Sequence, residues 1–296
     1  MQSDQNFRKG LILALSAFLL WGLAPIYFKA VRHVSPLEVL SHRILWSVVI
    51  LLLVVHGRKQ WSVVRALTWS TIKPLLLSSV LVSTNWFVFI WAVGQGRVLE
   101  TSLGYFINPL ISVSLAVVFL AERLRPIQWL AIALAALGVV NQIVVVGSLP
   151  WVALVLAFSF GFYGLIRKQV RVDPVVGLLL ETVLLLPIAL AYLAYLGVQG
   201  DLMFMAGSGQ LDLLLVFAGL VTTVPLLLFA AGTQRLSLTV MGVAQYTAPS
   251  MTFLLAVFWY QEAFDAQQLV TFVCIWLGLF VFTLEGLRRR KTPQVV

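Results

Sequence analysis

Ten long apolar runs, separated by short polar connections, constrain the fold of this chain more than any other feature. A helix needs about 20 apolar residues to cross the ~30 Å hydrocarbon core of a membrane. Ten such helices would use about 200 of the 296 residues and leave roughly nine residues for each connection. We therefore predict an all-α integral membrane protein with ten transmembrane helices, over residues 10–30, 37–55, 72–93, 101–120, 127–146, 151–166, 175–196, 211–231, 239–260 and 266–287.

The composition leaves no room for a soluble domain, because 61% of the residues are apolar and 10% are charged. The sequence contains neither a G-x-x-x-x-G-K-[ST] phosphate loop nor an H-E-x-x-H zinc motif. The net charge of +9 would favour nucleic acid as a partner of a soluble protein, but here Lys and Arg lie mostly in the connections. We expect the lipid bilayer as partner and no nucleic acid. His33, His42 and His56 are not at metal-ligand spacing, so we expect no metal and no cofactor.

The distribution of basic residues predicts the orientation of the chain. With ten spans, 16 of the 20 Lys and Arg residues lie on the side that holds both termini. Basic loops stay in the cytoplasm, so both termini are predicted to be cytoplasmic. A nine-span chain with one re-entrant run is the alternative, and it would place the basic cluster from Arg288 to Lys291 outside.

The chain also repeats itself once. An offset of 138 pairs Pro36 with Pro174, Ala92 with Ala230, Gly94 with Gly232 and Arg97 with Arg235; an offset of 140 pairs Pro109 with Pro249, Glu122 with Glu262 and Gly138 with Gly278. These matches predict two five-helix repeats, over residues 1–147 and 148–296. Because five is odd, the second repeat would be inverted in the membrane. Inverted repeats are characteristic of secondary transporters, which bind substrate near the membrane midplane between the halves.

Polar and aromatic side chains near mid-depth are the candidates for substrate binding, since polar groups are costly in lipid. They lie beside a mid-depth proline or aromatic residue in the third, fourth, eighth and ninth spans: Asn85, Trp86, Tyr105, Asn108, Thr222, Thr223, Gln245 and Tyr246. The alternative is that these amides and hydroxyls are hydrogen-bonding links between helices.

Two charged residues, Arg43 and Glu181, are superposed by the offset of 138. Each lies seven residues after a proline, so the inverted repeat would place them roughly 10 Å from opposite faces of the core. We interpret them as outer and inner gates, with Glu181 taking up a coupling proton when its side is dehydrated. A static ion pair, or separate structural contacts, is the alternative.

Four segments carry a family likeness. They are the run from Ser102 to Leu110 (SLGYFINPL), Asn85-Trp86 with Trp91-Ala92-Val93, His42-Arg43 with Trp46-Ser47, and the run from Val221 to Leu227 (VTTVPLL). These segments resemble RarD proteins, a branch of the EamA group in the drug/metabolite transporter superfamily. One departure is Gly94-Gln95, where RarD relatives have Val-Asn. The resemblance implies ten helices in the bacterial inner (plasma) membrane, with spans one to four and six to nine forming a basket and the fifth and tenth outside it.

The leading functional prediction is a secondary transporter that moves small organic metabolites or drugs without ATP. The resemblance implies export or exchange, and the inverted repeat implies alternating access. A membrane structural or assembly factor is one alternative, and it would tolerate replacement of the mid-depth polar residues. A membrane enzyme acting on lipid-linked substrates is another, but it needs a cluster of acids, histidines or metal ligands near one interface, and the sequence shows none.

Overall fold

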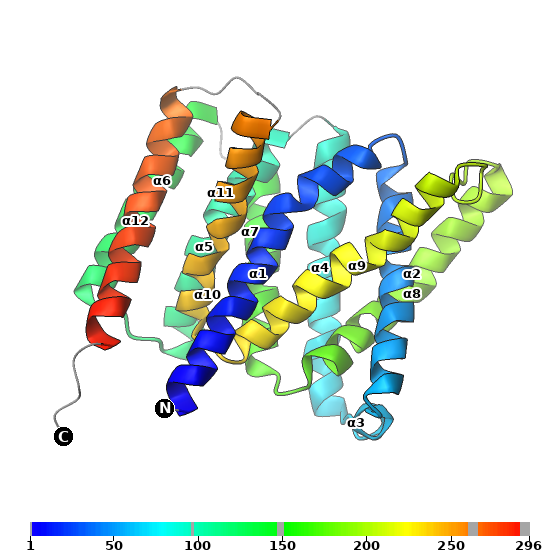
Figure 1. The fold of residues 1–296 in the computed structure, drawn as a ribbon, viewed down its shortest axis with the longest axis horizontal. Coiled ribbons are helices and arrows are strands. Elements are labelled where there is room, and N and C mark those ends of the chain that lie inside the picture. Colours follow the sequence, from blue (N-terminus) through cyan, green and yellow to red (C-terminus); the bar gives the residue numbers. More distant parts are fainter. Residues whose placement is uncertain (1, 96–97, 147–150, 260–265, 291–296) are drawn as a thin grey trace.

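Helices make up the described part of the chain and run back and forth between two ends of the molecule (Figure 1). The computed structural model describes residues 2–95, 98–146, 151–259 and 266–290. Helix α1 begins and α12 ends at the same end, which we call the terminal end; the opposite end is the distal end. The elements are α1 (Gln2–Ala30), α2 (Pro36–Gly57), α3 (Trp61–Arg65), α4 (Trp69–Gly94), α5 (Val98–Leu120), α6 (Pro126–Val146), α7 (Trp151–Gln169), α8 (Pro174–Gln199), α9 (Gly209–Thr233), α10 (Leu238–Gln245), α11 (Thr247–Leu254), the π-helical turn η1 (Leu255–Trp259) and α12 (Ala266–Arg290).

Prolines and capping side chains set where several helices begin. Pro36 and Pro174, which the sequence offset pairs, are the first residues of α2 and α8. Proline suits this position because the first N–H groups of a helix have no partner within the helix. The Asp173 carboxylate accepts a hydrogen bond from the Val175 backbone N–H at 2.9 Å, which satisfies one of these donors in α8.

The outer surface is apolar, as a lipid-facing surface must be. Six of the described helices are long and apolar enough to cross a membrane, and three more apolar helical stretches, in α5, α6 and α12, are shorter. Large apolar side chains such as Val118, Val144 and Ile188 lie on the outside, each 72% exposed. The chain is therefore an all-helical integral membrane protein.

The helix boundaries differ from the sequence prediction in two places that concern function. Helix α7 continues to Gln169, beyond the predicted end at residue 166, so Arg167 belongs to the helix rather than to a connection. The predicted ninth span is divided into α10, α11 and η1, with the break at Tyr246. Pro249 explains this break, because it has no N–H to bond the Gln245 carbonyl four residues earlier.

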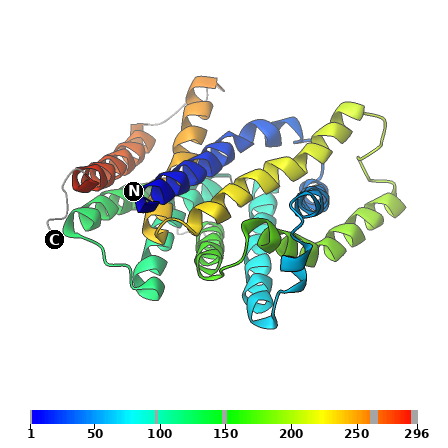
Figure 2. The ribbon, with the colours of Figure 1, turned by 60° about the horizontal axis from the view of Figure 1, so that its bottom comes forward.

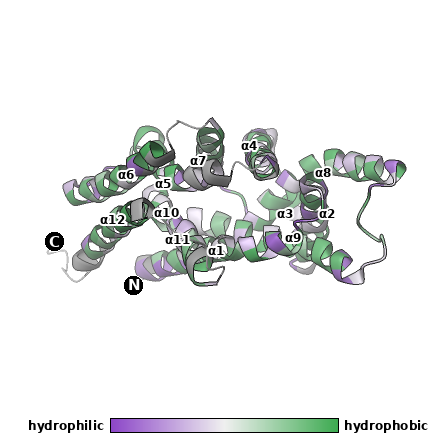
Figure 3. Cartoon of the chain, turned by 90° about the horizontal axis from the view of Figure 1, so that it is seen from above, coloured by the Kyte–Doolittle hydropathy of each residue, from purple (hydrophilic) through white to green (hydrophobic). Residues whose placement is uncertain are grey.

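The helices pack in two bundles with a separate pair at one edge. We call α1, α2, α9, α10 and α11 the first bundle and α4, α5, α7 and α8 the second. Two helices of the first bundle join it to the second, because α2 packs on α8 as well as on α9, and α10 packs mainly on α5. Seen from above, α11, α1 and α9 form one row and α5, α7, α4 and α8 form another, while α6 and α12 lie at one side (Figure 3). Helices α6 and α12 pack against each other along their length, and the turned view shows them at the edge of the molecule (Figure 2). The buried apolar core lies between the two bundles.

Candidate functional site

Arg43 lies between the bundles and holds together several residues that the sequence singled out. Its Nε donates a hydrogen bond to the Thr222 Oγ1 of α9 at 2.8 Å. The Thr222 hydroxyl itself donates to the Ala218 carbonyl at 2.8 Å, so its proton is used within α9 and its oxygen faces Arg43. Arg43 is 6% exposed and Thr222 is 1% exposed. The hydrogen bond to Thr222 therefore fixes the Nε side of the enclosed Arg43 guanidinium.

Aromatic rings cover both the guanidinium and the space beside it. The Arg43 Cζ lies 4.9 Å from the ring centroid of Trp86 and 5.5 Å from that of Phe28, within the range of cation–π contacts. Phe89 continues this wall, with ring centroids 6.3 Å from Phe28 and 5.9 Å from Tyr105. Tyr105 lies within electrostatic range of Arg43 and is 45% exposed. We call Arg43, Thr222, Trp86, Phe28 and Tyr105 the Arg43 site.

The Arg43 site thus unites four of the residues predicted from sequence, from α2, α4, α5 and α9. Sequence reasoning did not identify Phe28 and Phe89, because a phenylalanine in an apolar transmembrane run carries no polar signal. Only the packing of α1 and α4 places their rings beside Arg43.

Asn85 does not join this site. Its side-chain amide donates to the Leu156 carbonyl at 2.9 Å and to the Ser159 Oγ at 3.0 Å, and both residues belong to α7. Asn85 therefore links α4 to α7 within the second bundle. This geometry corresponds to the helix-linking alternative for that residue.

Three other candidates are buried where α5 and α9 meet their neighbours. Gln245 donates from Nε2 to the Ser112 Oγ at 3.1 Å, which connects α10 to α5. Asn108 is 7% exposed, and its Oδ1 accepts no hydrogen bond from the residues that the structure describes. The Thr223 hydroxyl, 1% exposed, is also without a partner among those residues. These side chains lie within helix interfaces.

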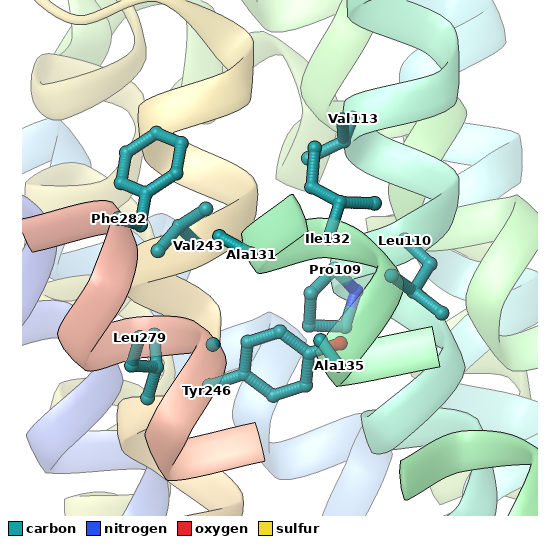
Figure 4. Close-up of a pocket in the computed structure, with 11 residues that line it drawn as sticks. Pro109, Leu110, Val113, Ala131, Ile132, Ala135, Val243, Tyr246, Leu279 and Phe282 are labelled. Carbon is teal, nitrogen blue, oxygen red and sulfur yellow. The ribbon is translucent and has the colours of Figure 1, made fainter. Parts of the chain in front are cut away.

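Tyr246 turns away from the Arg43 site. It lines a small apolar pocket between α5, α6, α10 and α12, together with Pro109, Ala135 and Leu279 (Figure 4). Its side chain is buried, and its hydroxyl has no hydrogen-bond partner in the described structure. Consecutive residues on a helix point in directions about 100° apart, which is why Gln245 and Tyr246 face different neighbours.

Glu181 belongs to a second buried group, which we call the Glu181 cluster: Glu181, Arg167, Ser78 and Tyr163. The Ser78 hydroxyl donates to Glu181 Oε1, and the Tyr163 hydroxyl donates to Oε2 at 3.5 Å. Arg167 Nη1 lies 3.5 Å from Glu181 Oε1, and both side chains are 1% exposed. The cation paired with Glu181 is therefore Arg167, and no ion pair joins Glu181 to Arg43, both of which the structure describes.

Sequence reasoning missed Arg167, because it counted this residue among the basic residues of a connection. The offset of 138 does pair Arg167 with Lys29 while it pairs Glu181 with Arg43. In both repeats a basic residue therefore lies 14 positions before the charged residue of the following span. This repeated spacing was the sequence signal that could have identified Arg167.

An aromatic cluster adjoins the Glu181 cluster and shares Tyr163 with it. It consists of Phe18, Trp21, Phe160, Tyr163 and Phe229, and the Tyr163 and Phe229 rings stack at 5.9 Å. Phe18 precedes Phe28 by ten residues along α1, which corresponds to about 15 Å. The cluster therefore lies closer to the terminal end than the Arg43 site, and Phe18, Tyr163 and Phe229 are almost fully buried.

Within the described residues, no group of three or more His, Cys, Asp or Glu side chains is arranged to hold a metal ion. The polar chemistry at the Arg43 site is that of a guanidinium, a hydroxyl and aromatic rings.

Comparison with known proteins identifies the family. Residues 8–141 and 149–284 each match the EamA-like transporter family. An uncharacterized transporter of Vibrio cholerae is 49% identical, covering 96% of this chain and 95% of that protein. Protein RarD of Escherichia coli K12 is 45% identical, with coverage of 97% and 98%.

A protein crystal structure that is 20% identical in sequence superposes with a TM-score of 0.72, covering 93% of this chain and 97% of that one, which shows a shared fold. The two family matches and the full-length likeness to RarD lead to one conclusion. The chain belongs to the EamA-like transporter family, in its RarD branch.

Proposed function

We propose that this protein is a secondary transporter that exports or exchanges small organic metabolites or drugs across the bacterial inner membrane by alternating access. The observation that carries the proposal is the Arg43 site, which lies between two helix bundles and has a half-exposed Tyr105 beside an enclosed cation. In secondary transporters the substrate binds at the interface of two halves that move against each other. Family membership favours this function over the assembly factor and the lipid-linked enzyme.

The proposed architecture is ten transmembrane helices in two inverted repeats, residues 1–147 and 148–296. Two separate family matches, at residues 8–141 and 149–284, support this division. The packing also supports it: α1 packs on α9 and α11 as α7 packs on α4 and α5, while α6 pairs with α12 and α2 with α8. Such an exchange of neighbours is what a two-fold axis between the repeats would produce.

We further propose that the terminal end is cytoplasmic and that this end is closed. Polar contacts join the bundles there: the Gln234 side chain donates to the Val172 carbonyl at 2.6 Å, and Lys168 donates to the Leu236 carbonyl. Glu122 accepts hydrogen bonds from the backbone N–H groups of Leu238 and Thr239, at 2.7 and 3.1 Å. Together with the aromatic cluster, these contacts support an outward-facing state.

Glu181 and Arg43 are the proposed gate residues, with Glu181 as the site of proton coupling. The Glu181 cluster links α4, α7 and α8 near the closed end, so protonation of the carboxylate would weaken its pairing with Arg167. Glu181→Gln should reduce uptake driven by a pH gradient while leaving solute exchange intact. An unchanged pH profile in this variant would leave Glu181 with a structural role only.

A direct test is reconstitution of the purified protein into liposomes loaded with a bacterial metabolite extract. After dilution into buffer without ATP, specific solutes should leave the loaded vesicles, and mass spectrometry should detect them in the external medium. Vesicles with Tyr105→Leu, which removes the exposed ring, should lose these solutes at least about tenfold more slowly. The proposal fails if wild-type vesicles release no solute faster than protein-free vesicles do.

A further inference from the structure

Two arginines are buried in this molecule, and their surroundings differ. Arg167 is paired with Glu181, and its Nε and Nη1 atoms are sealed inside the protein. Among the residues that the structure describes, Arg43 has no carboxylate partner, and its one hydrogen bond to them uses Nε. Its two terminal nitrogens make no hydrogen bond to the residues that the structure describes, and the residue is 6% exposed. The charge of Arg43 is therefore enclosed by protein, with two donor nitrogens that no described residue accepts from.

The protein supplies little to balance this charge. Thr222 contributes a neutral oxygen, while Trp86 and Phe28 contribute ring faces. Buried charges are ordinarily paired with an opposite charge, because burial in a low-dielectric interior disfavours an isolated ion. Among the described side chains, the other buried acids are already engaged: Glu38 with the Met203 and Phe204 N–H groups, Glu285 with Arg125, and Glu181 with Arg167.

The orientation of the Arg43 guanidinium determines which kind of anion can pair with it. Because Thr222 occupies Nε, the two terminal nitrogens form the free edge, and that edge matches the two oxygens of a carboxylate in a bidentate pair. Beside it, Phe28, Phe89 and Tyr105 form a continuous aromatic wall, of which Tyr105 is the most exposed member. Such a wall accommodates a flat apolar group.

We propose that the Arg43 site binds the carboxylate of a small organic acid that bears an aromatic or similarly flat group. This inference rests on the proposed transport function and deepens it, because it assigns the substrate class. Arg43 neutralises the carboxylate and Thr222 orients the guanidinium. The aromatic wall contacts the remainder of the solute.

Matched pairs of probes test the proposal. Benzoate, phenylacetate and indole-3-acetate are each titrated against purified full-length protein at pH 7.5, beside the corresponding neutral amides, and binding is read from the shift in unfolding temperature. At least one acid should stabilise the wild-type protein saturably, with its amide binding at least tenfold more weakly. If none of the acids binds, or if acid and amide bind equally well, the proposal is overturned.

Variants locate the binding at Arg43. Arg43→Gln should weaken binding of the acid about tenfold to a hundredfold, since a hydrogen-bonded charge pair is lost. Arg171→Gln, at an exposed arginine, is the matched control and should bind as the wild type does. Should Arg43→Gln fail to fold, Arg43→Lys keeps the charge but loses the paired nitrogens, and binding should still weaken about tenfold. Undiminished binding in the folded variant would contradict the assignment.

The outcomes separate this inference from the proposed function. Acid binding that depends on Arg43, without solute flux in the liposomes, would reject the transport function and keep the binding site. Flux confined to neutral or cationic solutes and insensitive to Arg43→Gln would reject the anion site and keep the transporter.

Discussion

Side chains of the same type serve different purposes in this molecule, depending on what surrounds them. Arg167 is enclosed in an ion pair, while Arg43 has aromatic neighbours and two nitrogens without a partner among the described residues. The two residues therefore predict different consequences when disturbed. Overpacking against the enclosed Arg167 side chain should affect folding, and a change near Arg43 should affect binding.

Gly177 makes room for Arg167. A Cβ atom at this position of α8 would lie 2.2 Å from Arg167 Nη1 and 2.9 Å from Val172 Cγ1. Because Arg167 is fully enclosed, it can move away only by giving up its pairing with Glu181. Gly177→Ala should lower stability by about 1–3 kcal/mol, the usual effect of overpacking. Gly197→Ala on the same helix meets no atom within 4 Å and should not lower the unfolding temperature measured in detergent.

Asn85 and Tyr105 should respond in opposite ways to replacement by leucine. Asn85→Leu removes two hydrogen bonds to α7 and should lower stability by about 1–2 kcal/mol, while flux per folded molecule stays near normal. Tyr105→Leu alters an exposed ring and should preserve stability but reduce flux. Thermal unfolding and liposome flux, measured on the same preparations, check both expectations. Normal stability with lost flux in Asn85→Leu would instead place Asn85 at the substrate.

At the scale of helices, small residues decide how closely elements approach. Gly138 and Gly278, paired by the offset of 140, both lie at the crossing of α6 and α12. A Cβ at Gly278 would come within 2.6 Å of the Ala131 carbonyl oxygen, and one at Gly138 within 2.8 Å of that of Thr271. Close backbone approach at small residues is a common means of packing helices in membranes.

A larger side chain at the crossing of α6 and α12 should force these two helices apart. Gly278→Ala should destabilise the protein by about 1–3 kcal/mol, because backbone atoms cannot move aside as a flexible side chain can. The fraction of protein that stays monodisperse on size-exclusion chromatography after graded heating measures the effect. Gly57→Ala, with no neighbour within 4 Å, is the control. Equal heat resistance of the two variants would show that α6 and α12 tolerate a wider spacing.

At the scale of the whole molecule, the two ends have different characters. At the terminal end Gln234, Lys168 and Glu122 each reach the opposite bundle, while at the distal end the Ser35 and Tyr192 hydroxyls lie 3.4 Å apart. The Arg43 site lies beyond the aromatic cluster, towards the distal end. The proposed outward-facing state requires that the terminal end faces the cytoplasm.

Reporter fusions test that orientation. Fusions after Arg65 and Arg171 and at the C-terminus should be fluorescent with green fluorescent protein and inactive with alkaline phosphatase, because basic connections remain in the cytoplasm. A fusion after Gly207, at the distal end, should show the reverse pattern. Phosphatase activity at the C-terminus would contradict both the ten-span topology and the inverted repeat.

The sequence by itself determined the helical membrane class and the approximate depth of the polar residues. In lipid, backbone groups must bond within their own segment, so a long apolar run can form little other than a helix. Distance along that helix then sets depth, which is why Trp86, Tyr105 and Thr222 could be selected as one layer. The repeated Pro36 and Pro174 likewise marked the start of two helices.

Only the tertiary structure decided which neighbour each polar side chain meets. Asn85 and Trp86 are adjacent in sequence and equal in depth, yet Asn85 bonds α7 while Trp86 covers Arg43. Arg167 looks like a basic loop residue until the packing of α7 on α8 encloses it beside Glu181. The physical reason is that depth depends on position along one helix, whereas the facing partner depends on how helices distant in the sequence pack around it.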